Sequence, residues 1–183
     1  MEEKKIIKAL KDKNAKDIAF KSLVRLYKVR LYWHIRKFVK SHEDTDDILQ
    51  NTFIKIYQNI GNFNENAKLF TWMYRIATNE TINHLKRRAK MNFTDIDSLL
   101  KEKTMQLEHD IYYNGTEIQL KLQKSISKLP YKQQLIFNMK YFENLKYSEI
   151  SEILNTSIGS LKASYHIAVK KIKKDIVKID TNE

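Results

Sequence analysis

The sequence has no cysteine, one proline and only three glycines among its 183 residues. Without cysteine, a disulfide framework and every thiolate metal site are excluded. Sheets and tight hairpins need glycine and proline at their turns, so the scarcity of both predicts an all-α protein. No apolar run approaches the roughly 20 residues that span a bilayer, and the charged N-terminus lacks the apolar core of a secretion signal. We therefore expect a soluble, cytoplasmic protein.

Positive charge is in excess. The 34 Lys and Arg outnumber the 22 Asp and Glu and give a formal net charge of +12. This excess favours an acidic partner, namely nucleic acid, an anionic membrane or an acidic protein. A generally lysine-rich proteome is the alternative explanation. The length suits one medium domain or two small ones.

The first half of the chain has apolar residues at the three- and four-residue steps of helices. Two helices are expected between residues 6 and 39, and Leu23, Leu26 and Leu31 follow the helical spacing of the second. Ser41 and Asp44 have the spacing of a capping box that opens a third helix, and Gly61 is expected to end it. A polar loop over residues 62–68 leads into a fourth helix, residues 69–90, which ends in basic side chains.

The spacing becomes irregular over residues 91–114, which we interpret as a flexible linker between domains at residues 1–90 and 115–183. Helical spacing returns at Glu117, and Pro130 suits the first turn of another helix. That helix is expected to bury Leu135, Ile136, Met139 and Phe142. A short helix over residues 147–154, a turn over 155–157 and a last helix from residue 158 to about 174 follow.

These last three segments have the outline of a helix-turn-helix, whose second helix enters the major groove of DNA. Ser157 is placed to cap that helix and to bring its N–H groups near a phosphate. One face is apolar, with Ile158, Leu161, Tyr165, Ala168 and Ile172. The other face is expected to contact phosphates and base edges through Ser160, Lys162, Ala163, His166, Ile167 and Lys170. A chance outline with a merely solvated lysine face explains this segment, taken alone, equally well.

Two stretches carry a recognisable set of residues. The second half has Leu129-Pro130, Tyr141-Phe142-Glu143, Tyr147, Glu149-Ile150, Glu152-Ile153-Leu154 and Gly159-Ser160-Leu161-Lys162. The first half has Asp47-Ile48-Leu49-Gln50, Thr52-Phe53, the loop that contains Phe63, Trp72-Met73, Arg75-Ile76-Ala77, Asn79 and residues 84–88. These stretches resemble region 4 and region 2, respectively, of the extracytoplasmic-function (ECF) group of bacterial RNA polymerase sigma factors. The chain departs from the family at Ser151, where Ala is usual, at Ala163-Ser164, where many members have Ser-Arg, and at Asn51, where Glu is usual.

The resemblance implies a region 2 helical bundle and a region 4 helix-turn-helix joined by the linker. It also implies a function: directing core RNA polymerase to promoters by recognising their −35 and −10 elements and melting the DNA. The implied partners are core polymerase, through its β′ clamp helices and β flap, promoter DNA and an anti-sigma factor. No enzymatic activity, cofactor, metal or small-molecule substrate is implied. A stand-alone helix-turn-helix regulator that binds operator DNA is the alternative.

Two further sets of site residues fall in the first domain. Core polymerase is expected to contact the residues that lie off the apolar stripe of the third helix, namely Asp47, Gln50, Asn51 and Ile54. The acids there also complement the helix dipole, and both roles stay open. Strand opening at the −10 element is assigned to a loop that receives an extruded base and to the next helix, which contacts the displaced strand. The residues expected to take part are Asn62, Phe63, Asn64, Lys68, Trp72, Arg75, Asn79, Lys86, Arg87 and Arg88. Trp72 also has the spacing of a core residue.

Overall fold

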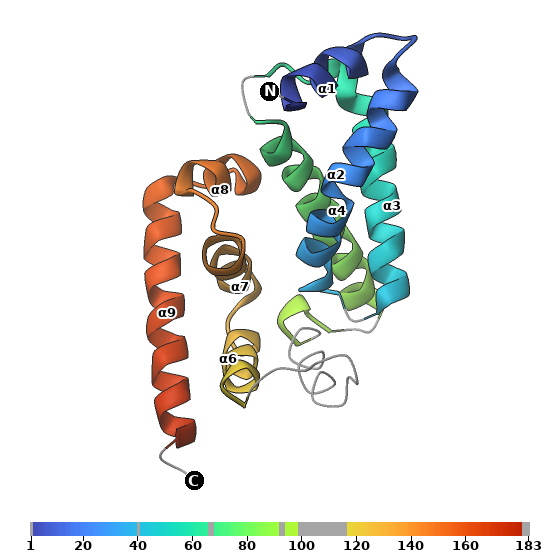
Figure 1. Cartoon of the computed structure of the whole chain (residues 1–183). Helices are drawn as coiled ribbons and strands as arrows, with labels where there is room; N and C mark the ends of the chain where they lie inside the picture. The colour runs from blue at the N-terminus through green and yellow to red at the C-terminus, as the bar shows by residue number, and fades with distance from the viewer. Residues whose placement is uncertain (1, 40, 66–67, 92–93, 99–116, 181–183) are drawn as a thin grey trace. The chain divides into compact units, whose positions relative to one another are not determined.

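The computed structural model describes residues 2–39, 41–65, 68–91, 94–98 and 117–180, and every regular element within these ranges is helical (Figure 1). The all-α fold class is therefore confirmed. The chain forms two compact units, Met1–Leu85 and Lys86–Glu183. Of the expected linker, only Met91 and residues 94–98 lie within the described residues. In the described part of the chain, no helix is long and apolar enough to cross a membrane.

The first unit contains α1 (Glu2–Lys11), α2 (Lys16–Arg36), α3 (His42–Asn59), the 3-10 turn η1 (Ile60–Asn62) and most of α4 (Leu69–Met91). Helix α2 packs against α1 and α3, and η1 contacts both α1 and α3. The Ser41 side chain accepts a hydrogen bond from the Asp44 backbone N–H at 2.9 Å, so the expected N-terminal cap of α3 is confirmed.

One detail of the first unit was predicted wrongly, namely the end of the third helix. Helix α3 ends at Asn59, and Gly61 lies inside the 3-10 turn that follows. No described glycine has a positive φ, so Gly61 is not a left-handed cap. Leu26 is 51% exposed, because α2 buries the face that carries Leu23, Tyr27 and Leu31. At 100° per residue, Leu26 lies about one quarter-turn away from Tyr27 and outside that face.

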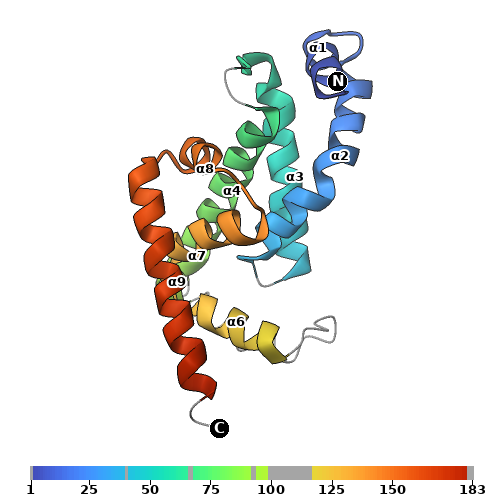
Figure 2. The same ribbon diagram turned by 60° about the vertical axis from the view of Figure 1, so that its left-hand side comes forward.

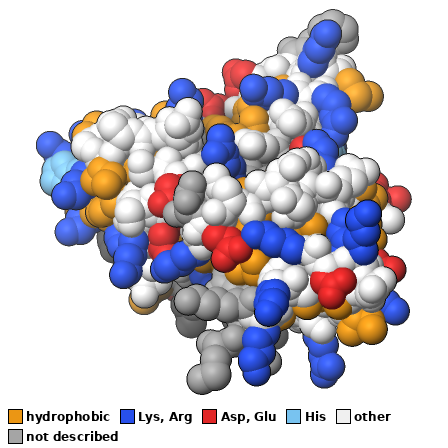
Figure 3. Space-filling view, turned by 90° about the horizontal axis from the view of Figure 1, so that it is seen from above, with side chains coloured by type: hydrophobic (Ala, Val, Ile, Leu, Met, Phe, Trp, Pro, Cys, Tyr) orange, Lys and Arg blue, Asp and Glu red, His pale blue; other side chains and the backbone are white. Residues whose placement is uncertain are grey.

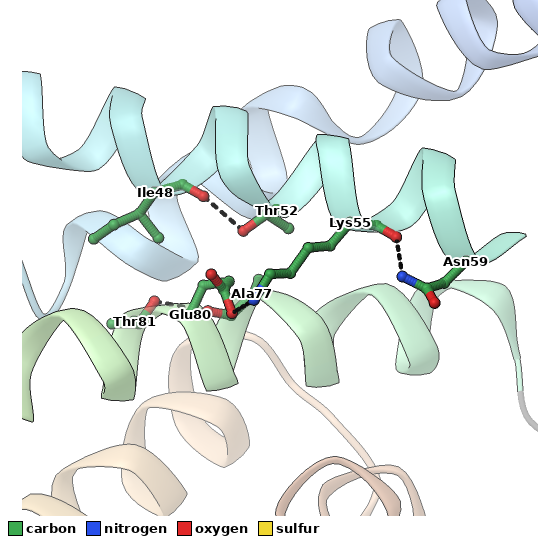
Figure 4. Close-up of polar contacts among 7 residues, drawn as sticks. All are labelled: Ile48, Thr52, Lys55, Asn59, Ala77, Glu80 and Thr81. Carbon is green, nitrogen blue, oxygen red and sulfur yellow. Dashed lines mark hydrogen bonds and ion pairs between the residues drawn. The ribbon is translucent and has the colours of Figure 1, made fainter.

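Several buried polar side chains lie on α4 and on the neighbouring helices α2 and α3. The buried His34 ring on α2 contacts the Thr78 hydroxyl on α4 at 2.9 Å. Buried Thr52 on α3 and Thr81 on α4 donate hydrogen bonds to backbone carbonyls of their own helices, at 2.7 and 2.8 Å (Figure 4). Their hydroxyls are thereby satisfied without water, which permits close helix packing.

The second unit contains α6 (Glu117–Ser127), α7 (Tyr131–Phe137), the π-helical turn η2 (Asn138–Phe142), α8 (Tyr147–Leu154) and α9 (Ile158–Asp180). Helix α9 runs along α6, α7 and α8 in turn (Figures 1 and 2). Its inner face joins a core made of Ile126, Leu129, Phe137, Ala168 and Ile172, with Leu122, Tyr165, Val169 and Ile176 packed around it.

Three expectations for the second unit need correction. Phe142 is 41% exposed rather than buried, because the π-helical turn changes the angle per residue after Phe137. Ile158, the first residue of α9, is also exposed. Helix α9 continues to Asp180, beyond the expected end near Lys174. Pro130 immediately precedes α7, and its carbonyl accepts hydrogen bonds from Gln133 and Gln134.

Candidate nucleic-acid and partner interfaces

The outward face of α9 is solvent-exposed along its N-terminal half. All six residues assigned to base edges and phosphates are exposed: Ser160, Lys162, Ala163, His166, Ile167 and Lys170. The opposite face is closed, since Leu161, Ala168 and Ile172 are buried. At the left edge of Figure 3, where α9 lies, blue Lys and Arg side chains surround a pale-blue His. The structure thus brings this set together on one basic surface, which we call the α9 face.

The turn before α9 has the geometry of a helix-turn-helix. Asn155 caps the C-terminus of α8 with a φ of 49°, in the left-handed region that Asn tolerates better than most residues. The Ser157 hydroxyl accepts a hydrogen bond from the Ser160 N–H at 3.3 Å, and its carbonyl accepts one from Leu161 at 3.0 Å. The expected Ser157 cap is therefore present, and it leaves the first turn of α9 at the surface.

One basic residue near the α9 face was missed by the sequence reasoning. The ammonium groups of Lys140 and Lys162 lie 5.2 and 6.0 Å from the centre of the Tyr147 ring. Lys140 is also held by the Leu145 carbonyl at 3.1 Å. It belongs to the π-helical turn η2, where helical periodicity does not indicate which residues share a face. Lys140 therefore adds a second cation beside the N-terminal part of α9.

The outward face of α3 carries the residues assigned to polymerase binding. Asp47, Gln50 and Asn51 are exposed, and Ile54 is 46% exposed although it is large and apolar. We call these four residues the α3 face. Asp44 has a different environment, since one of its carboxylate oxygens lies 3.9 Å from the His84 Nε2. Sequence reasoning missed four exposed apolar residues on the neighbouring α2: Ile18, Leu26, Val29 and Trp33.

The loop between η1 and α4 differs from expectation in one respect. Phe63 is only 3% exposed, and its ring centre lies 5.4 Å from that of Trp72 on α4. The expected stacking surface on Phe63 is therefore absent in this structure, because its ring packs into the core. Trp72 is half-buried, which suits its role as a core residue. Asn62, Asn64 and Lys68 are exposed, so these polar side chains lie at the loop surface.

Helix α4, which comes after the loop, carries basic residues along its length. Arg75, Asn79 and Lys86 are exposed, and at 100° per residue they lie within about 40° of one another. Arg87 is exposed on a different side of the helix, and Arg88 is partly buried. The structure therefore brings three of the five expected phosphate-tracking residues onto one line along α4.

Comparison with known proteins shows the same two-part organisation. Residues 23–91 match sigma-70 region 2, and residues 119–172 match sigma-70 region 4. The ECF RNA polymerase sigma factor SigW of Bacillus subtilis (strain 168) is 32% identical over 182 residues, covering 94% of this chain and 96% of SigW. The chain belongs to the ECF group of RNA polymerase sigma factors. The expected function in transcription initiation is confirmed, and the alternative of a stand-alone regulator is wrong.

A second relative and two solved structures are also similar to this chain. The RNA polymerase sigma-H factor of Pseudomonas aeruginosa is 28% identical over 172 residues, covering 85% of each protein. Among solved structures, CnrH in complex with the cytosolic domain of CnrY has a TM-score of 0.70 at 16% identity and covers both chains fully. The sigma factor RpoE in complex with the anti-sigma factor NepR from Bartonella quintana has a TM-score of 0.65 at 17% identity, covering 88% of this chain and 98% of RpoE. These two structures share the fold of this chain.

Proposed function

We propose that this ECF sigma factor divides promoter-specific initiation between its two units. The α3 face binds the β′ clamp helices of core polymerase, and the loop after η1 together with α4 opens the −10 element. The α9 face recognises the −35 element, and the second unit also binds the β flap. This work takes place in the cytoplasm, where core polymerase and the chromosome meet, and it requires neither a cofactor nor enzymatic activity.

The observation that supports this division best is the contrast between the two faces of α9. Its inner face is closed by the core of the second unit, while Lys162, His166 and Lys170 lie exposed at four-residue steps. The two lysines supply sequence-independent affinity over duplex DNA, and the residues between them, including His166, reach base edges. Ala163 and Ile167, which are apolar and exposed, suit contact with thymine methyl groups.

For polymerase binding, the supporting observation is the chemistry of the α3 face. Ile54 is exposed next to an acid and two amides, which is the composition of an interface centre with a polar rim. An anti-sigma factor completes the proposed partners. NepR has that role for RpoE of Bartonella quintana, which shares the fold of this chain.

The test combines the purified chain with bacterial core polymerase and a promoter selected from a random duplex library. Wild-type holoenzyme should give promoter-dependent transcripts. Asp47→Ala and Ile54→Ala should weaken polymerase binding, with Asp46→Ala, an exposed acid of the same helix, as the control. Lys162→Ala should spare polymerase binding and impair use of the −35 element.

Lys171→Ala is the matched control for the α9 face, because Lys171 carries the same charge but lies toward α7, with its Nζ 3.2 Å from the Gln133 Oε1. The proposal fails if wild-type protein gives no promoter-dependent transcript. The division of tasks fails if the α3 and α9 variants reduce polymerase binding and −35 recognition to the same extent.

A further inference from the structure

The N-terminal helix α1 lies against the start of the loop that is proposed to open the −10 element. Helix α1 contacts the 3-10 turn η1, and its Ile7 and Leu10 are buried. This helix lies outside the matched region 2, which begins at residue 23. The family match therefore assigns no role to the element that lies beside the loop.

An ion pair links α1 directly to the loop. The Lys11 Nζ lies 2.7 Å from the Glu65 Oε1, across 54 positions of sequence. The Glu65 backbone has a φ of 59°, which costs free energy for a residue with a Cβ atom and persists only where neighbours hold it in place. The Lys11 ion pair is one contact that links this residue to α1.

A second anchor fixes the other side of the same short segment. The Phe63 N–H donates to the Ile60 carbonyl at 3.1 Å, and the Phe63 ring packs 5.4 Å from the Trp72 ring. Asn64 lies between these two anchored residues and is itself exposed. Its amide offers both donors and acceptors to the pairing edge of a base.

We propose that α1 positions this loop for strand opening, with Lys11 as a positioning residue that acts through Glu65 and does not touch DNA. A loop that is already held in its binding conformation loses less conformational entropy when it captures an extruded base. The inference rests on the proposed function of the loop. It adds an element from outside region 2 to the opening machinery.

The ion pair is exposed, with 39% and 53% of the two side chains accessible, so its removal should leave the fold intact. We expect Lys11→Glu to reduce transcription from a duplex promoter about 1.4- to fivefold, the range for an exposed pair. The same variant should have little effect on a template whose melted region is already unpaired, because that template needs no strand opening. Binding to core polymerase should be unchanged.

The charge-swapped double variant Lys11→Glu/Glu65→Lys separates positioning from DNA contact. It should restore duplex-promoter activity to near the wild-type level, because the ion pair is re-formed with reversed polarity. Lys8→Glu is the control, since Lys8 is exposed on the same helix and the change in net charge is identical. It should leave activity on both templates unchanged.

Three results would overturn the inference while leaving the proposed function intact. One is wild-type activity of Lys11→Glu on the duplex promoter. Another is an equal loss on duplex and pre-melted templates. The third is failure of the double variant to recover, which would indicate that Lys11 contacts DNA itself. A wild-type holoenzyme without promoter-dependent transcripts would instead refute the proposed function.

Discussion

The second unit depends on a small core, and Leu161→Ala tests how much of its stability that core supplies. Leu161 is 0% exposed on the inner face of α9. Truncating a buried leucine to alanine costs about 2–5 kcal/mol, because the transfer free energy and packing contacts are both lost. The helices α6 to α9, residues 117–180, form a module of roughly 60 residues, for which the free energy of unfolding is about 3–9 kcal/mol. The substitution should therefore remove between a quarter and all of the stability of this unit.

Hydrogen exchange read by mass spectrometry reports the two units separately. In Leu161→Ala, the amides of α7 and α9 should exchange faster by a factor of about 30 or more, which corresponds to about 2 kcal/mol. The amides of α2 and α3, which belong to the first unit, should keep their wild-type rates. Lys162→Ala, at the neighbouring exposed position, should leave α7 protected. Equal loss of protection in α3 would refute the reasoning, because the two units would then unfold together.

Three further predictions concern single residues of the second unit. Burial raises the pKa of Tyr131 well above its ordinary value of 10.0. The free energy of unfolding of this unit should therefore be unaffected by Tyr131 below about pH 10 and decrease as the pH rises further. Denaturant unfolding from about pH 9 to 11 should show a smaller decrease for Tyr131→Phe than for the wild type. Gln134→Leu should destabilise α7 by about 1–3 kcal/mol, measured by hydrogen exchange, because the Gln134 Nε2 donates to the Ser127 and Leu129 carbonyls at 3.2 and 2.8 Å. Lys170→Ala should reduce the salt dependence of −35 DNA binding by about 0.9 in log–log slope, the value for one phosphate contact. An unchanged slope would show that Lys170 makes no such contact.

Features that depend on a few adjacent residues were predictable from the sequence. Ser41 and Ser157 cap helices through N–H groups only three residues away, so their spacing alone located the starts of α3 and α9. The burial of Leu161 and Ala168 followed equally from helical periodicity, because α9 is regular throughout. The residues of α9 that do not lie on this buried face could then be predicted to be exposed.

Features that depend on distant parts of the chain were not predictable in this way. Phe63 sits in a polar loop, and only the folded unit shows that its ring meets Trp72. The exposure of Phe142 depends on a π-helical turn, and the spacing of apolar residues in the sequence does not reveal that turn. The pair between Lys11 and Glu65 joins residues that no local pattern relates.

The π-helical turn η2 should limit insertions and deletions at this point in related chains. The Glu143 N–H donates to the Asn138 carbonyl five residues earlier, so this turn holds one residue more than an α-helical turn would. Deleting one residue here would rotate everything that follows by about 100° and shift it by about 1.5 Å. Ile150 and Ile153 would then leave their buried sites. Insertions and deletions should therefore be rarer between Phe137 and Glu143 than their partly exposed side chains suggest.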